Sequence, residues 1–583
     1  MIKGVRFGTL GFSTERVAFC GSRGFSRQQP ERPRVERAGF GTRFFSYAFL
    51  GLTGVYFADN KFNNSVITRA TRSVTTLLLI SADYKWNFEE GKDIEALHQR
   101  NSKRLYDMIA SNKGLYVKIG QMIAIQGSMF PMAYQEKFKR LFDNAPADSW
   151  ATVDSVLSAE LGRDYRTKHF EWIDEAPVAS ASIAQVHKAV LKNGEKVAVK
   201  VQHKSLEHQV PVDLAIYQQV MDFYSWFFEM QISFVTQYIC DTMKEETDFN
   251  IEYRNGALLK SKIDSDPEFR NRMYVPKVYP DLVTKKVLVA EWIEGDSVSE
   301  MKRLKVKGYN IAELSKDIVK LYARQAFEWG DVHSDPHPGN FIVRMVKDGN
   351  KTRQQLVILD HGLYVHLSDK FRREYCQLFK ALSEADTATM KQLTTEWGIR
   401  QGDMFTSMAT MSTEGMKDMK KRFEEMRTKS DYEKQVMMKE QMKNFFDSTD
   451  KFPLAMVFLG RGMRIVQGIN HQLGAPVNRL AILSDEARRS LRLSPLVPTL
   501  AKSSILSRTF AQSVYRYAIF CTFRVVLTLA YWTYRIRSNV YAFFAPHSKG
   551  AGEDIEEVID KQMVYAAQTM GMQVKTGDYA YLG

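Results

Sequence analysis

Cysteine is scarce in this chain of 583 residues. The four cysteines, Cys20, Cys240, Cys376 and Cys521, lie more than a hundred residues apart. Because no two of them form a C-x-x-C pair, a disulfide framework and a thiolate zinc site are both excluded.

The chain also contains few glycines and prolines, 34 and 16 residues, and 44% of its residues are hydrophobic. This composition excludes a collagen-like or mainly disordered protein. At several times the usual domain length of ~150 residues, the chain is predicted to form two or three packed units.

Acidic residues are absent from one long stretch of the chain. Residues 487–550 hold ten Lys and Arg and no Asp or Glu, and residues 1–50 hold nine basic residues against three acidic ones. Subtracting these contributions of +10 and +6 from the total of +14 leaves the rest of the chain at −2. A nucleic-acid-binding domain needs a basic surface on its main fold, so we expect no nucleic-acid partner.

The first 43 residues are rich in Arg, Ser, Gly and Phe and poor in acid. They lack the apolar core that a secretory signal carries directly after its first basic residues. This composition is typical of a mitochondrial presequence, and we predict one at residues 1–43. A disordered basic tail is the alternative.

No apolar stretch is both long enough and free enough of charge to be an ordinary transmembrane helix. Residues 44–58 carry no charge, but fifteen residues of helix cover only about 22 Å of a hydrocarbon layer of ~30 Å. We predict a short anchor or interfacial helix there, with a buried core helix as the alternative. Residues 515–534 are longer but contain Arg516 and Arg524, which are costly at mid-bilayer. They predict a helix lying on a membrane, or one packed on the protein's own body.

The most informative segment begins with a predicted strand pair. Residues 183–191 and 196–201 are β-type runs joined by Lys192-Asn193-Gly194-Glu195, and Asn-Gly is a strong hairpin signal. In the second run Lys200 lies on the face opposite the alternating valines. This resembles the V-A-I-K strand of kinases, whose lysine pairs nucleotide phosphates and a helix glutamate.

The loop before this strand pair differs from that of ordinary kinases. A kinase has G-x-G-x-x-G there, whose glycines let backbone N–H groups approach phosphates closely. Here the loop reads Ala179-Ser180-Ala181-Ser182. Since the alanine methyl groups restrict that approach, we expect nucleotide to bind in a different pose or with altered preference.

Two further segments resemble the catalytic and metal-binding loops of kinases. His333-Ser334-Asp335 is followed by Asn340, and Asp360-His361-Gly362 comes twenty residues after Asn340, behind an apolar strand. In kinases the Asp of His-Arg-Asp is followed at this spacing by an Asn that binds magnesium, and a later Asp-Phe-Gly supplies the second metal carboxylate. The strand with Lys200 and these two segments follow one another in the order and at the separations found in kinases. Each segment alone is a weak signal, but the three together predict a kinase-like fold.

The chain has no room for an activation segment. After Gly362 it passes through residues 363–367 into an amphipathic stretch from Ser368, and Ser334 replaces the arginine that pairs with an activation-loop phosphate in regulated kinases. Because protein kinases dock peptides on that segment, an ordinary protein substrate is not expected. Phosphoryl transfer to a small molecule or lipid head group fits better, as does ATP hydrolysis coupled to a conformational change.

A metal-dependent hydrolase is the rival interpretation of the same residues. The clustered side chains resemble a dinuclear metal site. Two prolines around one of the histidines indicate a rigid turn instead, and a hydrolase offers no role for Lys200. The residues in question are His333, Asp335, His337, Asp360 and His361.

Taken together, these motifs resemble the UbiB/aarF-domain atypical kinase-like family over about residues 100–400. The most specific marker is Lys118-Ile119-Gly120-Gln121, which matches the K-x-G-Q signature of that family. The alanine-containing loop at 179–184 is similar to the family's A-rich loop, and Glu246-Thr247-Asp248 is similar to its E-x-D motif. Asp-His-Gly in place of Asp-Phe-Gly resembles the mitochondrial aarF-domain-containing branch.

The resemblance implies a role for each site residue. Lys200 and Glu252 would orient the phosphates, Asp335 would position or deprotonate the acceptor, and Asn340 with Asp360 would hold Mg²⁺. Lys118, Gln121, Glu246 and Asp248 would form a lid over the cleft. On a single helix Glu246 and Asp248 point about 200° apart, so one of them needs a kink or a different partner. The predicted contacts to ATP or ADP are residues Ala179, Ser180, Ala181, Ser182, Ile183, Ala184 and Lys200, with hinge residues Glu291 and Ile293 near the adenine.

We therefore predict an α+β, two-lobed protein-kinase-like fold with an N-terminal K-x-G-Q helical extension and a C-terminal helical tail. The expected boundaries are 59–148 for the extension, 149–290 for the N-lobe, 291–486 for the C-lobe with a charged, Met-rich helical insertion at 402–450, and 487–583 for the tail. By resemblance we expect a kinase or ATPase of the mitochondrial inner membrane that acts in lipid or ubiquinone homeostasis, with a membrane lipid or a ubiquinone-related small molecule as partner. A nucleotide-binding scaffold with little turnover is the alternative.

Overall fold

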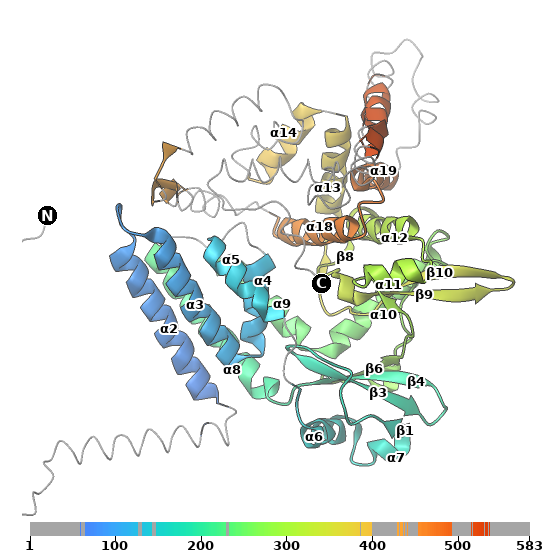
Figure 1. Cartoon of the computed structure of the whole chain (residues 1–583), viewed down its shortest axis with the longest axis horizontal. Coiled ribbons are helices and arrows are strands. Elements are labelled where there is room, and N and C mark those ends of the chain that lie inside the picture. The colour runs from blue at the N-terminus through green and yellow to red at the C-terminus, as the bar shows by residue number, and fades with distance from the viewer. Residues whose placement is uncertain are drawn as a thin grey trace, which may run out of the picture. The chain divides into compact units, whose positions relative to one another are not determined.

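Contacts between Cα atoms divide the chain into Met1–Ala58 and Asp59–Gly583. The computed structural model describes residues 59, 65–125, 131–142, 147–228, 233–384, 386–398 and 453–491, with short pieces at 428–440 and 515–536 (Figure 1). The predicted presequence, the predicted anchor at 44–58 and most of the predicted insertion at 402–450 lie outside these residues. Within the described part, none of the helices combines the length and the apolar character needed to cross a bilayer.

An antiparallel sheet forms the first lobe. The hairpin was correctly predicted: β3 and β4 pair along their lengths, and Gly194 in the turn has φ +82°, a conformation that favours glycine. Val197, Val199 and Val201 are buried on one face of the sheet, and Lys200 points to the other. The strands in the order β1-β3-β4-β6, with β2 beside β3, are β1 Phe170–Ile173, β3 Ala184–Leu191, β4 Lys196–Gln202, β6 Val287–Glu291 and β2 Ala179–Ser180.

Helices fill the long connection from β4 to β6, as the 52-residue gap between Lys200 and Glu252 predicts. They are α8 Leu206–Phe228, α9 Ser233–Glu246 and α10 Phe249–Ser265. Asp248 accepts a hydrogen bond from Asn250 N at 2.9 Å and so caps α10. One helix ends at Glu246 and the next begins at Phe249. Glu246 and Asp248 therefore do not follow the angular spacing of a single helix.

The K-x-G-Q motif lies on α4 within a group of N-terminal helices. Gly120 is required there by packing, since a Cβ atom at this position would lie 2.3 Å from Leu141 Cδ1 and 3.2 Å from Ile109 Cγ2. Arg69 of α2 forms a buried ion pair with Asp213 of α8, which fastens the group to the rest of the chain. The group comprises α2 Val66–Asn87, α3 Ile94–Asn112, α4 Leu115–Ile125, α5 Met132–Phe138 and the 3-10 turn η2 Lys139–Phe142; α6 Trp150–Leu161 and α7 Tyr165–His169 follow it and pack on the first sheet.

The second lobe combines helices with a long β-hairpin. Its sheet runs in the order β5-β10-β9-β7, and a separate two-stranded ladder joins β8 to β11. Its strands are β5 Met273–Tyr274, β7 Asp296–Ser297, β8 Asp331–His333, β9 Phe341–Asp348, β10 Lys351–Ile358 and β11 Tyr364–His366. Its helices and short turns are α11 Met301–Val306, α12 Ile311–Arg324, η4 Gln325–Trp329, η5 Pro338–Asn340, α13 Asp369–Ser383, α14 Thr387–Glu396, α18 Ala455–Gln472 and α19 Arg479–Ser490. The remaining short turn, η3 Pro280–Leu282, packs on the first sheet through Leu282.

The core of the second lobe is built around α12, which packs against α18 and α19 (Figure 1). Arg324 is 1% exposed and contacts the carboxylates of Asp266 and Glu268, which follow α10, and of Glu486 on α19. A buried cation held by several carboxylates is satisfied without water. The predicted α+β architecture is confirmed.

Close packing of α18 on α12 generates a testable prediction. A Cβ atom on Gly462 would lie 2.7 Å from Tyr322 Cε2, whereas one on Gly460 would meet nothing within 4 Å. We expect Gly462→Ala to lower the free energy of unfolding by about 1–3 kcal/mol through overpacking. The matched control Gly460→Ala should raise it by up to ~1 kcal/mol, because alanine favours helix. Denaturant unfolding measures both, and equal effects would contradict this packing.

Candidate active site

Two loops of the second lobe are held side by side by a short ladder. Strand β11 pairs with β8, with Tyr364 opposite His333, and Ser334 N donates to Leu363 O at 3.0 Å. The loop that carries Asp335 follows β8, and the loop that carries Asp360 precedes β11. The ladder therefore places the two aspartates on neighbouring loops, as the sequence predicts for kinase-like catalytic and metal loops.

Backbone hydrogen bonds fix the catalytic-loop residues. Asp335 N donates to His333 Nδ1 at 3.1 Å, and Asn340 Nδ2 donates to Asp335 O at 3.1 Å. Leu359 N donates to Asn340 O at 3.0 Å, which ties this loop to the end of β10. Since the Asn340 amide nitrogen is used within the loop, its side-chain oxygen is the atom left to bind a ligand.

Lys200 connects the first lobe to both α10 and the metal loop. Its Nζ donates to both carboxylate oxygens of Glu252 at 2.8 Å and lies 3.6 Å from Asp360 Oδ2. Burial lowers the pKa of Lys200, but the charges of Asp360 and Glu252 outweigh burial and raise its pKa overall. Burial raises the pKa of Glu252, and Lys200 opposes that rise. With two short contacts to the ammonium, the pair is ionised at neutral pH.

Asp360 is the more accessible member of this cluster. Its side chain is 41% exposed, and its Oδ1 accepts a hydrogen bond from Gly362 N at 2.9 Å. Burial raises the pKa of this carboxyl, but Lys200 and the Gly362 hydrogen bond lower it well below the usual range. An ionised, partly exposed carboxylate is a hard oxygen ligand of the kind Mg²⁺ prefers.

His361, which replaces the usual phenylalanine, is packed rather than free. Its Nδ1 lies 3.1 Å from Tyr364 Oη, and its backbone oxygen accepts from Asn255 Nδ2 at 3.0 Å. A Cβ atom on Gly256 of α10 would lie 3.0 Å from the imidazole. Burial lowers the pKa of His361 to about 3, so the ring is neutral and serves as a packing group between the metal loop and α10.

The K-x-G-Q helix reaches the same cluster through one residue. Lys118 Nζ lies 2.5 Å from Glu246 Oε1. Although burial lowers the pKa of Lys118, the charges of Glu246 and then Asp335 raise it overall. Gln121 donates instead to Leu141 O at 2.9 Å, within the helical group.

Asp248 differs from its predicted place in the lid network. Its carboxylate caps α10, and we find no ion pair between Lys118 and Asp248 among the described residues. The physical reason is that α9 ends at Glu246 and α10 begins at Phe249, so Asp248 stands at the start of a helix. The first backbone N–H groups of a helix have no partner within it, and the Asp248 carboxylate accepts from one of them.

Arg461 on α18 is a site residue that sequence reasoning missed. Its Nη2 lies 3.0 Å from Asp335 Oδ1, and its side chain is 4% exposed. Burial raises the pKa of Asp335, but Arg461, His337 and Lys118 outweigh burial and lower this pKa to about 2. No sequence signal marks this arginine, which stands 126 residues after Asp335 among 81 basic residues.

The alanine-containing loop is closed by its own backbone. Ala181 N donates to Ala184 O at 2.8 Å, and Ala181 O lies 2.9 Å from His203 Nε2. Ser180 Oγ is buried and has no hydrogen-bond partner among the described residues. Ile183 is buried in a hydrophobic cluster. The Ala181 amide is therefore already used within the loop and is not free to donate to a ligand. The other residues predicted to contact the nucleotide have these positions: Ala179 lies with Ser180 on β2, Ala184 begins β3, and Ser182 lies in the turn between the two strands.

The predicted hinge follows β6. Glu291 N donates to Lys277 O at 2.7 Å, and Trp292 N donates to Lys196 O at 3.0 Å. The described structure records no backbone hydrogen bond from Ile293 N. Of the two predicted hinge residues, Ile293 is thus the one whose amide can donate to a ligand.

The histidines of the rival hydrolase interpretation have structural partners. His333 stacks on Tyr364 with ring centroids 5.1 Å apart, and His337 Nδ1 accepts from Gly339 N at 3.1 Å. In the described ranges we find no group of three or more His, Cys, Asp or Glu side chains placed to hold a metal ion. The side chains of Asn340 and Asp360 fit Mg²⁺ bound together with nucleotide phosphates, which supply further oxygens.

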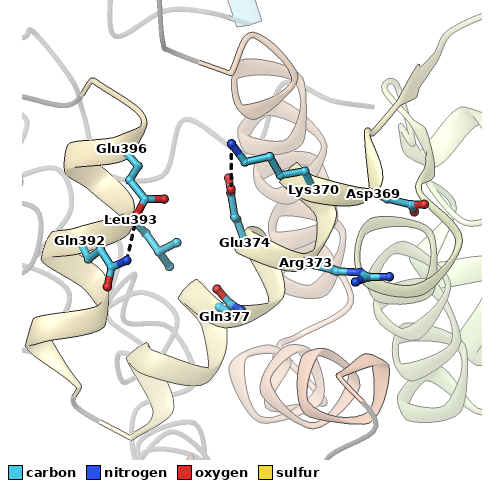
Figure 2. A pocket seen from close by; sticks show the side chains of 8 residues that line it. All are labelled: Asp369, Lys370, Arg373, Glu374, Gln377, Gln392, Leu393 and Glu396. Atoms are coloured by element: carbon cyan, nitrogen blue, oxygen red, sulfur yellow. Dashed lines mark hydrogen bonds and ion pairs between the residues drawn. The ribbon is translucent and has the colours of Figure 1, made fainter.

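A polar cavity of about 490 Å³ lies between α13 and α14, away from this cluster (Figure 2). Figure 2 shows Lys370 turned toward Glu374 and Gln392 toward Glu396, so its charged and polar side chains partly satisfy one another. None of the predicted site residues lines it. The cavity is therefore separate from the candidate active site.

The fold and the site together define an atypical kinase-like protein. Residues 140–394 match the family model described as the ABC1 atypical kinase-like domain. The chain is 36% identical over 453 residues to an ABC1 family protein of Schizosaccharomyces pombe, covering 76% of this chain and 83% of the relative. It is 31% identical to an ABC1 family protein of Purpureocillium lilacinum, covering 88% and 89%. It is also 31% identical to AarF domain-containing protein kinase 1 of Gallus gallus, covering 62% and 70%. The chain belongs to this ABC1, or UbiB/aarF, family, as its motifs predict.

The buried pair of Arg461 and Asp335 predicts a coupled effect on stability. Either Arg461→Met or Asp335→Asn removes one charge and leaves the other without its partner. Each should lower the free energy of unfolding, by about 3–5 kcal/mol where the remaining charge stays buried. The double variant should lose clearly less than the sum. A denaturant-unfolding double-mutant cycle measures this, and strictly additive losses would show that the pair does not interact.

Proposed function

We propose that this chain is a membrane-associated atypical kinase or ATPase that binds Mg-ATP at the site formed by Lys200, Asn340 and Asp360. The observation that carries the proposal is the Lys200 ammonium, which contacts Glu252 at 2.8 Å and Asp360 at 3.6 Å. In kinases a lysine paired with a helix glutamate faces the metal-binding aspartate in this way. Membership of an atypical kinase-like family supports the same conclusion.

Each residue would take a distinct task with nucleotide bound. Lys200, held by Glu252, would orient the phosphates, while Asn340 and Asp360 would hold the divalent ion. Mg-ATP supplies the transferable γ-phosphoryl group and neutralises its charge. Asp335, kept ionised beside Arg461, would accept a hydrogen bond from the attacking hydroxyl or water and so orient it.

The acceptor in this proposal is not an ordinary protein. From Asp360 to the start of α13 at Asp369 the chain has only the turn and the short strand β11, so a peptide-docking segment is missing here. On the other side, α4 brings Lys118 to Glu246, next to the catalytic loop. A small molecule, a lipid head group or water would fit the space that remains better than a polypeptide.

We assign the protein to mitochondria, at the inner membrane, and to lipid or ubiquinone homeostasis. The support is the sequence: an Arg-rich, acid-poor segment at residues 1–43 and the basic region at 487–550. A ubiquinone-related molecule or a membrane lipid would be the partner, by likeness to the mitochondrial branch of the family.

A nucleotide-binding scaffold with little turnover is a second candidate function. It is favoured by one specific observation: Asp335 Oδ1 is already engaged by a buried arginine. In that case ATP occupancy, rather than phosphoryl transfer, would be the useful event.

The nucleotide site is tested by binding of ATP with and without Mg²⁺. We expect Lys200→Ala to weaken affinity by about tenfold or more, because it removes a charge-assisted contact to the phosphates. Asp360→Asn should abolish the gain in affinity that Mg²⁺ gives the unaltered protein. Asp369→Asn, at an exposed aspartate that begins α13, is the matched control and should change neither. Unchanged affinity in both site variants would show that nucleotide binds elsewhere or not at all.

Turnover separates the kinase or ATPase from the scaffold. Asp335→Asn should keep ATP affinity while lowering the rate of phosphate release or transfer by at least about a hundredfold. Radiolabelled ATP measures both quantities on one preparation. If the unaltered protein binds Mg-ATP but shows no turnover above that of Asp335→Asn, the scaffold is the correct function.

The proposed location is tested by import. Residues 1–43 fused to a fluorescent protein should direct it to mitochondria, because a positively charged, acid-poor leader is what the import machinery recognises. Replacing the arginines of the leader with glutamine should abolish import. A fusion that stays outside mitochondria contradicts the assignment without affecting the nucleotide site.

A further inference from the structure

One helix near the C-terminus exposes a row of apolar side chains. The described residues between 515 and 536 are all helical and form the red helix in Figure 1. Leu529 is 62% exposed and Trp532 is 53% exposed. Single exposed apolar residues need no explanation, but a contiguous row of them marks an interaction surface. We call this row the apolar face; it consists of Tyr515, Val525, Val526, Leu529, Trp532 and Ile536.

The opposite side of the helix is fastened to the protein. Phe520 is 6% exposed and lies under the Arg488 guanidinium of α19, 4.0 Å from ring centroid to Cζ. Arg524 lies 3.4 Å from Asp485, and Tyr531 Oη donates to Pro476 O at 2.6 Å. The helix is therefore docked by one side, and its exposed row is not the side that packs on the lobe.

Helical geometry places these two sides opposite each other. At 100° per residue, Leu529 is about 180° from Phe520 and about 160° from Tyr531. Val525, Leu529, Trp532 and Ile536 follow each other at three- and four-residue spacing, which keeps them on one face. The apolar face thus points away from the lobe along its whole described length.

The surrounding charge selects the kind of partner. Residues 487–550 carry ten Lys and Arg and no acid. An apolar row within a chain segment that carries basic residues and no acid is complementary to a lipid interface with anionic head groups. Trp532 and Tyr515 are residue types that settle at that interface. Because Arg516 and Arg524 lie within this stretch and an arginine is costly at mid-bilayer, the helix would lie along the interface rather than cross it.

We propose that the apolar face is a docking surface for an anionic lipid bilayer, with the helix axis parallel to the membrane plane. This deepens the membrane association in the proposed function and rests on it, but it does not depend on ATP binding or turnover. It also fixes an orientation, because α19 and the second lobe would lie directly behind the docked helix.

Vesicle flotation of the purified full chain tests the proposal. The probes are vesicles of phosphatidylcholine alone and of phosphatidylcholine with phosphatidylglycerol. The unaltered protein should float with the anionic vesicles, and less so at high salt. The double variant Leu529→Gln with Trp532→Gln should bind at least about tenfold more weakly, since it removes two apolar side chains from the interface without changing charge. Thr528→Gln is the matched control: this exposed residue lies at the edge of the apolar face, about 100° from Leu529 around the helix, so binding should change by much less than in the double variant.

Each other outcome overturns the proposal. Undiminished flotation of the double variant would place membrane binding on another part of the chain. Equal loss in Thr528→Gln would show a general effect on the helix, and absence of flotation in the unaltered protein would remove the lipid partner. Light scattering gives the remaining outcome: an oligomer that the double variant dissociates would make this face an interface between copies of the chain. The nucleotide-binding assay, run on the same variants, shows separately whether the candidate active site is intact.

Discussion

The ion pair between Lys200 and Glu252 is the contact on which the candidate active site depends. It joins a strand of the first lobe to α10, and α10 in turn packs against His361 beside Asp360. A buried pair of this kind contributes little net stability, because desolvation offsets the attraction. The pair instead fixes the positions of the two side chains, because moving either one away would leave the other charge buried without a partner.

Cations from three parts of the fold pair with the carboxylates of the site. Lys200 of the first sheet contacts Asp360, and Arg461 of α18 contacts Asp335. Lys118 of the K-x-G-Q helix contacts Glu246. The pKa values of Asp335 and Asp360 are both lowered despite burial, so both carboxylates are ionised. A site of this kind is prepared for a divalent cation and a polyanion together, and it also holds its acidic groups in place without them.

Sequence reasoning worked best where a backbone rule fixes a residue's position. Strand alternation placed Lys200 opposite the valines, and Asn-Gly placed the turn at Gly194. The spacing of Asp335, Asn340 and Asp360 gave the two neighbouring loops. Sequence reasoning worked less well for Asp248, whose role depends on where one helix ends, and it did not identify Arg461 at all. The contact of that arginine is set by how tightly Gly462 lets α18 approach α12, and no local pattern in a single sequence encodes a tertiary distance of that kind.

The position of Arg461 also bears on where the functional unit ends. The segment that matches the family model stops at residue 394, yet the partner of Asp335 lies on a helix that begins at Ala455. A fragment that ends at residue 394 would keep every motif named above and would leave the Asp335 carboxylate without its ion-pair partner. The loop that carries Asp335 and helix α18 therefore form one structural unit, so a change that displaces α18 would also change the charge balance around Asp335.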